Sequence, residues 1–182
     1  EALLEELVAI NEYPKALLGT FDKDFLQLPS EVIITSMKEH QRYFAVFNGE
    51  NLSNHFIAIS NSHTKDFTHV RAGNEKVLRP RLDDGMFFYK NDLRDGLNNE
   101  GLKKLSFVDG LGSVYDKLLR EVKIAKHLAK TFNISNDELI EKTVMMAKSD
   151  LMSEMVYEFT ELQGLMGYYY AKAAGEPQDV YT

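Results

Sequence analysis

The chain has 182 residues, a formal net charge of −7, 44% hydrophobic residues and 27% charged residues, values that are ordinary for a globular protein of one domain or two small ones. It contains no cysteine, which excludes disulfides, thiolate zinc sites and cysteine nucleophiles. No run of about 18 apolar residues occurs, so the sequence predicts no membrane span.

The first forty residues predict three helices. Apolar residues recur on one face of residues 1–10, a spacing typical of an amphipathic helix. Pro14 favours the start of a second, short helix that runs to Leu18. Pro29 suits the first turn of a third helix, which we place at residues 29–40.

Residues 42–60 predict a β-hairpin. Residues 42–47 and 55–60 are rich in aromatic and β-branched side chains, which favour strands. Between them, Asn48-Gly49 is a strong turn signal. Because the two runs are widely separated, we expect a loop longer than the two-residue turns that are commonest in hairpins.

Residues 70–93 predict a helix with one buried apolar stripe. Its members recur every three or four residues and are Leu78, Leu82, Met86, Tyr89 and Leu93. Pro80 lies inside this stripe, and a proline in a helix interior removes a hydrogen bond and costs about 3 kcal/mol. We therefore expect a kink at Pro80 or two shorter helices.

The remaining residues predict helices only. An apolar stripe runs from Val114 to Phe132, with Ser113 as the expected N-cap of this helix. Ser135 and Glu138 have the spacing of a capping box, which predicts a further helix that extends to about Asp150.

A cluster of Gly and Asn residues at 96–101 predicts a domain boundary. We expect an α+β chain, with a mixed helix and β-hairpin domain at residues 1–97. An all-helical domain follows at residues 98–182. The chain does not begin with Met and its first residues read as the body of a helix, so we expect a segment of a larger protein. Those acidic residues do not form a signal peptide, and we expect a cytoplasmic location.

Two groups of polar residues are candidates for contacts with RNA. The first group lies where a helix passes into a strand and consists of Lys38, His40, Gln41 and Arg42. The second group surrounds one asparagine and consists of Arg71, Asn74, Lys76, Arg79 and Arg81. Lys and Arg suit phosphate, and an amide can read a base edge. The residues alone leave an alternative open for each group: a solvated turn beside Tyr43 and Phe44, and a helix face on which Arg71 pairs with Glu75.

The distribution of charge favours the middle of the chain for such contacts. Residues 65–104 carry nine Lys/Arg and seven Asp/Glu, a net charge of +2, whereas residues 134–182 carry three and nine, a net charge of −6. A domain that binds nucleic acid through its overall field is usually basic. In this acidic chain, an RNA contact must therefore depend on a local patch.

Other kinds of site have little support in the sequence. No two histidines are four residues apart on a predicted helix, and no complete phosphate-binding fingerprint occurs. His127 is expected to point toward solvent, and a metal site formed by His127 with Asp150 is a minor alternative. We therefore predict no catalytic residue and no metal ligand in this chain.

Three stretches resemble the beta subunit of bacterial-type glycyl-tRNA synthetase. They read LPSEVIITSMKEHQRYF at 28–44, VRAGNEKVLRPRLDDGMFFYKNDL at 70–93 and AKSDLMSEMVYEFTELQGLMGYYYA at 147–171. The shorter LGSVYDK at 111–117 is also similar. The stretches follow the order of the family over most of the chain and correspond to the N-terminal and middle parts of that subunit. Pro80 and Gly85 stand where the family usually has alanine.

This resemblance implies part of an α2β2 glycine–tRNA ligase that joins glycine to tRNA with ATP. It implies that the active site, with ATP and Mg, belongs to the alpha subunit, and that this chain has no cofactor of its own. The implied partners are the alpha subunit and tRNA-Gly. A contact between two beta subunits is a further implied interaction.

The helical half also resembles the HD-type domain of the family. A metal-dependent HD hydrolase needs a His-Asp pair, and the sequence contains no His-Asp dipeptide. We therefore expect this domain to bind no metal. Two alternatives stay open: an HD-type phosphohydrolase, and a pure subunit-interaction module that touches no RNA.

Overall fold

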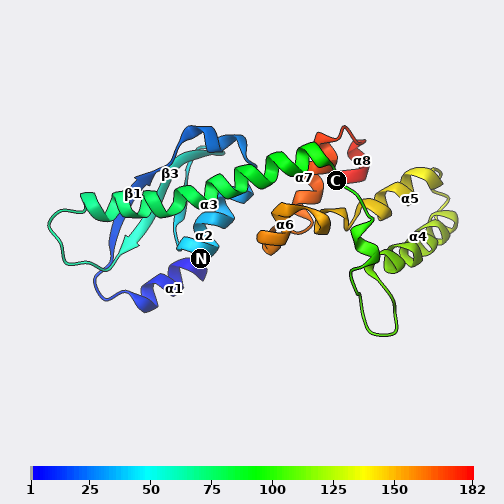
Figure 1. Cartoon of the computed structure of the whole chain (residues 1–182), viewed down its shortest axis with the longest axis horizontal. Coiled ribbons are helices and arrows are strands. Elements are labelled where there is room, and N and C mark those ends of the chain that lie inside the picture. Colours follow the sequence, from blue (N-terminus) through cyan, green and yellow to red (C-terminus); the bar gives the residue numbers. More distant parts are fainter. Residues whose placement is uncertain (1) are drawn as a thin grey trace. The chain divides into compact units, whose positions relative to one another are not determined.

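The computed structural model describes residues 2–182 and confirms the predicted α+β class (Figure 1). The helices are α1 (Ala2–Ile10), α2 (Ser30–Gln41), α3 (Thr68–Asp95), α4 (Val114–Thr131), α5 (Asp137–Met146), α6 (Glu154–Glu158), α7 (Leu165–Ala173) and α8 (Gln178–Tyr181). The strands are β1 (Lys15–Thr20), β2 (Phe44–Asn48) and β3 (Asn51–Ser60). Short 3-10 helices are η1 (Lys23–Gln27), η2 (Gly101–Lys103), η3 (Ser149–Met152) and η4 (Thr160–Leu162). None of these helices is long and apolar enough to cross a membrane.

The contacts divide the chain into two compact units, one up to Phe87 and one from Phe88 to Thr182. The division falls inside α3, so this helix contributes residues to both units. The predicted boundary between residues 97 and 98 lies just beyond the end of the same helix and stays a prediction.

The first unit contains one antiparallel sheet with the strand order β1-β3-β2. Strands β2 and β3 form the predicted hairpin, with Phe44 opposite Ile57. The expectation of a long loop was wrong, because β3 begins at Asn51 and only Gly49 and Glu50 remain between the strands. The first residues of β3 are mostly polar, so their strand conformation has no clear signal in the sequence. Gly49 adopts a φ of 64°, which glycine accommodates without strain.

Residues 15–20 form strand β1 and not the short helix that Pro14 suggested. They pair with β3 along their whole length, from Lys15 opposite Ser60 to Thr20 opposite His55. This long-range pairing outweighs the weak local preference for helix. Gly19 faces Phe56 so closely that an added Cβ would lie 2.3 Å from Cζ of that ring. The absence of a side chain at Gly19 therefore lets the fully buried Phe56 fill the core.

The core of the first unit combines buried side chains from α2, β3 and α3. They are Val32, Ile33, Met37, Phe56, Ala58, Leu78 and Leu82. Tyr43 stacks on Phe56 with ring centroids 4.7 Å apart. Gly85 is buried beside α2, where an added Cβ would lie 3.4 Å from Cγ1 of Val32. The small residue on α3 therefore sits where the two helices approach each other closely.

Helix α3 continues through Pro80 from Thr68 to Asp95, so the alternative of two shorter helices was wrong. Pro80 is exposed, and solvent can satisfy the Lys76 carbonyl that a proline leaves without its usual N–H partner. The predicted stripe is fully buried only at Leu78 and Leu82, while Leu93 is 43% exposed.

The second unit is helical, as predicted, and Ser113 is the N-cap of α4. The Ser113 hydroxyl accepts from the Asp116 N–H, and the Asp116 carboxylate accepts from the Ser113 N–H, which together form a capping box. Val114 and Leu118 pack with Leu102 in a local core cluster. Phe132, predicted to be buried, is 70% exposed because α4 ends at Thr131 and the chain turns there.

Helix α5 begins one residue later than the Ser135 capping box predicted. Its N-cap is Asn136, whose Oδ1 accepts from the N–H of Leu139 at 3.1 Å. The helix ends at Met146 and not near Asp150, because the chain then passes into η3.

Candidate nucleic-acid interface

The first group of predicted RNA contacts lies at the C-terminal end of α2. The helix stops there because Arg42 adopts the left-handed conformation, with φ 59° and ψ 34°. The guanidinium Nε of Arg42 donates to Oε1 of Glu6 at 2.8 Å, and this bond raises the pKa of Arg42. Arg42 also donates to the carbonyl of Glu39. Arg42 is therefore held by protein groups on two sides.

Lys38 lies beside Arg42, and the charges around these two residues are balanced. Its Nζ is 3.0 Å from Oε1 of Glu39, and both side chains are exposed, a kind of pair that contributes little to stability. Lys38 and Arg42 line a shallow cleft of about 180 Å³ together with Glu6 and Glu39. Gln41 is half-buried as the last residue of α2. Two cations and two carboxylates give this place no net attraction for phosphate.

His40 and Arg81 come from different predicted groups and meet inside the first unit. Nη2 of Arg81 lies 3.2 Å from Nδ1 of His40. Because a guanidinium can only donate, Nδ1 of His40 is the acceptor of this bond. This contact links α2 to α3, and both side chains are half-buried.

Asn74 also serves the interior. The hydroxyl of Tyr43 donates to Oδ1 of Asn74 at 3.0 Å. Tyr43 is only 7% exposed, and burial raises the pKa of its phenol. The carbonyl oxygen of the Asn74 amide is therefore engaged by a buried donor.

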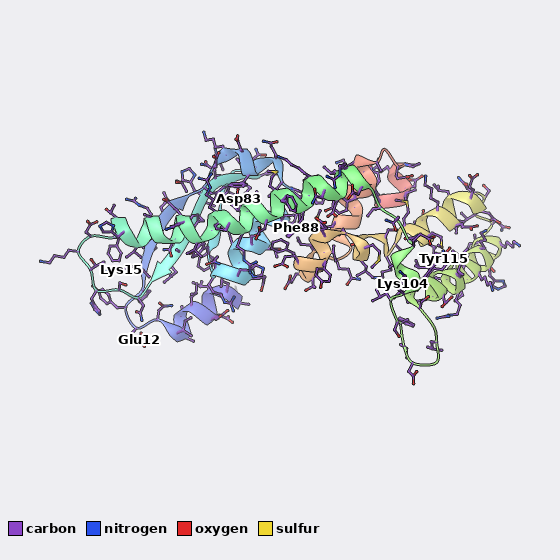
Figure 2. All side chains as sticks on the ribbon, viewed as in Figure 1. Glu12, Lys15, Asp83, Phe88, Lys104 and Tyr115 are labelled. Carbon is purple, nitrogen blue, oxygen red and sulfur yellow. The ribbon has the colours of Figure 1, made fainter. Side chains whose placement is uncertain are left out.

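Three of the predicted contacts are exposed cations on α3: Arg71, Lys76 and Arg79. Lys76 and Arg79 line an open cleft of about 480 Å³. Nε of Arg79 lies 3.8 Å from Oδ2 of Asp83, and both side chains are well exposed. Figure 2 labels Asp83 on α3. Arg71 lines a separate cleft of about 290 Å³ that also includes Asp66. These three cations are thus distributed over two clefts.

Glu75 fixes one wall of the larger cleft. Its Oε1 accepts from the backbone N–H of Thr20 at 2.9 Å and from the Thr20 hydroxyl at 3.2 Å. The alternative that Glu75 pairs with Arg71 is therefore not the arrangement the structure shows; Glu75 instead ties α3 to the end of β1.

Arg79 and Arg81 cannot share one face of α3. Residues two apart on an α-helix are separated by about 200° around its axis. Arg79 accordingly lines the cleft beside Glu75, whereas Arg81 contacts His40 of α2. The nine predicted residues therefore fall into several small groups and form no continuous basic surface.

Four lining residues of the larger cleft were not predicted from the sequence: Thr20, Phe21, Asp22 and Phe25. They belong to β1 and the segment after it, about fifty positions before α3 in the chain. No local spacing signals their position, because β1 was itself mistaken for a helix. The cleft offers two cations, two carboxylates and aromatic rings, which suits several weak contacts at once better than one strongly held anion. Two unit charges 4 Å apart in water attract by only about 1 kcal/mol.

No group of three His, Asp or Glu side chains within residues 2–182 is arranged to hold a metal ion. His127 is exposed on α4. Asp150 is buried, and its Oδ2 accepts from the backbone N–H of Gly164. The carboxylate that might have been a ligand therefore has a structural hydrogen bond.

Comparison with known proteins gives one consistent match. The family model described as glycyl-tRNA synthetase beta subunit matches residues 1–182. The glycine–tRNA ligase beta subunit of Helicobacter pylori (strain Shi470) is 53% identical over 186 residues, which covers 96% of this chain and 27% of that protein. The corresponding subunits of Marinobacter nauticus and Limosilactobacillus reuteri are 49% and 46% identical, over 99% and 100% of this chain. The chain spans 26–27% of the length of these curated relatives.

Proposed function

The chain belongs to the glycyl-tRNA synthetase beta subunit family, and we propose that it contributes tRNA binding and subunit assembly to a cytoplasmic glycine–tRNA ligase. In this proposal the alpha subunit is its partner in a heterotetramer. The alpha subunit carries the site for glycine, ATP and Mg. This chain supplies no catalytic residue, and a beta–beta contact is a further use of its surface.

The observation that carries the proposal is the family match over all 182 residues. The relatives are named as subunits of a ligase that acts on tRNA, and a chain of this family needs a surface that meets either tRNA or another subunit. Holding tRNA raises the effective concentration of its 3′ end at a partner's active site. The exposed Arg71, Lys76 and Arg79 are the predicted cations best placed to meet phosphate.

The test is a binding titration of the full-length beta subunit, assembled with its alpha subunit, against tRNA-Gly and a non-cognate tRNA. We expect the affinity to fall steeply between about 50 mM and about 200 mM salt, because each phosphate contact releases counterions. Changing Arg71, Lys76 and Arg79 together to Gln should weaken binding about tenfold and reduce the salt slope by about two.

A matched control changes Lys15, Lys23 and Lys65, three exposed lysines of the same unit, to Gln. This control has the same change in net charge and should bind tRNA within about twofold of the wild type. Salt-independent binding, or no loss of affinity when this chain is deleted from the subunit, would refute the proposal of a tRNA contact. Loss of the alpha subunit without loss of tRNA would instead favour the interaction module.

A further inference from the structure

Helix α4 carries a row of basic residues that the predicted RNA contacts do not include. Its solvent-facing side presents Arg120, Lys123, His127 and Lys130, all of them exposed. The opposite side contributes Val114, Leu118, Val122 and Ala129 to the interior. We call the four exposed residues the outer face of α4.

The charges of α4 are sorted by position. The helix has five Lys/Arg and two Asp/Glu, a net charge of +3 in a chain whose total is −7. The two lysines on its flanks are half-buried and paired: Lys117 with Glu121 at 2.6 Å, and Lys126 with Glu141 of α5. Within the described part of the chain, Lys123 and Lys130 have no carboxylate at ion-pair distance. The lysines of α4 without an ion-pair partner are thus the two on the outer face, while Arg120 interacts electrostatically with Asp116.

We infer that the outer face of α4 is a contact surface for the phosphate backbone of RNA. This inference deepens the proposed function, on which it rests, by assigning the tRNA contact to a place in the second unit. A concentration of unpaired cations on an otherwise acidic protein raises the local potential for a polyanion, and phosphate contacts supply most of the sequence-independent affinity for nucleic acid.

The dimensions of the outer face suit an extended polyanion. Arg120 and Lys130 are ten residues apart, which corresponds to about 15 Å along a helix. A nucleic-acid strand carries a negative charge on every nucleotide, so a row of this length can meet more than one phosphate at a time. A small phosphate ligand would instead need groups that converge on one point, and a row along a convex helix does not converge.

The chemistry of the outer face favours RNA over a protein partner. Protein interfaces have an apolar centre and are depleted in lysine. Here the centre of the surface is formed by Lys123 and His127, and its borders carry the exposed apolar side chains of Leu119, Ile124 and Leu128. These apolar side chains can contact ribose, while the polar centre lacks the apolar core that a protein partner would bury.

The experiment compares two double variants of the full-length beta subunit assembled with its alpha subunit. Lys123→Gln with Lys130→Gln removes two charges from the outer face. Lys117→Gln with Lys126→Gln removes two charges from the same helix at positions that already have carboxylate partners. Glutamine preserves helix propensity. Binding of tRNA-Gly and of a non-cognate tRNA is measured by fluorescence anisotropy over a series of salt concentrations, with thermal unfolding of each variant as a check on folding.

We expect the outer-face pair to weaken binding of both tRNAs about tenfold and to reduce the salt slope by about 1.5. The flank pair should change the affinity less than about twofold. Equal losses of tRNA affinity in the two double variants would mean that only net charge matters, and this result would overturn the inference. Wild-type affinity in the outer-face pair would also overturn it, while salt-sensitive binding by the wild type would leave the proposed function intact. Loss of the alpha subunit with unchanged tRNA affinity would assign the outer face to a protein partner instead. Absence of tRNA binding in the wild type would refute the proposed function itself.

Discussion

Replacing Asp92 with alanine should destabilise the second unit by about 3 kcal/mol, because its carboxylate accepts from three donors. Oδ1 accepts from the N–H of Glu154 at 2.8 Å, and Oδ2 accepts from the N–H of Met155 at 3.1 Å. Oδ2 also accepts from the hydroxyl of Tyr170 at 2.6 Å. The two N–H groups open helix α6, whose next donor is satisfied by the Ser153 hydroxyl at 3.1 Å.

The magnitude follows from what each donor can do after the carboxylate is lost. The bond from the Glu154 N–H is exposed, so this group can turn to water and loses about 0.5–1 kcal/mol. The bond from the N–H of the buried Met155 is only partly exposed, and its loss costs about 1 kcal/mol. The side chain of Tyr170 is buried, and a buried donor without a partner costs about 1–3 kcal/mol. Tyr170→Phe removes only that donor and should cost about 1 kcal/mol. The double variant should therefore be less destabilised than the sum of the single variants, by about 1 kcal/mol.

The assay is urea unfolding followed by circular dichroism, with the same denaturant slope required for every variant. Asn91→Ala is the matched control, since Asn91 precedes Asp92 and makes one exposed hydrogen bond, to Oε2 of Glu154 at 2.8 Å. This control should stay within about 0.5 kcal/mol of the wild type. A loss below about 1 kcal/mol for Asp92→Ala, or strict additivity with Tyr170→Phe, would refute the reasoning.

Three further predictions concern single positions. Burial and the hydrogen bond to Asp92 raise the pKa of Tyr170, so ionisation of this phenol favours the unfolded chain. The free energy of unfolding should therefore fall above about pH 10. Urea titrations at several pH values should show a less steep fall for Tyr170→Phe. Gly19→Ala should destabilise the first unit by about 2 kcal/mol or more, because its Cβ would meet the Phe56 ring. Gly85→Ala should stabilise the unit by about 0.5–1 kcal/mol. Thermal unfolding that ranks the two variants in the opposite order would contradict the close contact of Gly19 with Phe56. Ser113→Ala should cost about 1 kcal/mol through loss of the α4 cap, and Ser113→Thr should restore most of that loss in the same unfolding assay.

Local patterns in the sequence predicted those elements whose stability is local. Helices α3 and α4 have apolar stripes at helical spacing, and Ser113 supplies a cap that can be recognised from its own neighbours. Strand β1 was not predicted from its own sequence, because its conformation depends on pairing with β3, about forty positions later. The close contact between Gly19 and Phe56 is likewise a property of the pairing. It is not visible in either segment alone.

The candidate site was predictable only as a list of residue types. Local clustering of cations identified Arg79 and Arg81, but a helix turns them to opposite flanks, and Arg81 reaches His40. A pairing of Glu75 with Arg71 was an open alternative in the sequence, and Glu75 instead accepts a hydrogen bond from Thr20 of β1. Whether a cation is available to a ligand depends on which carboxylates and carbonyls surround it, and these come from distant parts of the chain.

The stretches that resemble the family contact one another inside each unit. In the first unit, residues 28–44 and 70–93 meet through His40 with Arg81 and through Tyr43 with Asn74. In the second unit, residues 70–93 and 147–171 meet where Asp92 accepts from Tyr170. Many of the residues that carry the resemblance therefore have a structural role, since they hold helices in place. A polyanion, in contrast, needs side chains that the fold leaves without partners. By that criterion Lys123 and Lys130, which lie outside those long stretches, are better placed than Arg42 or Arg81 to make the proposed tRNA contact. Mutagenesis guided by exposed unpaired charge is therefore a sharper test of that proposal than mutagenesis guided by the motif.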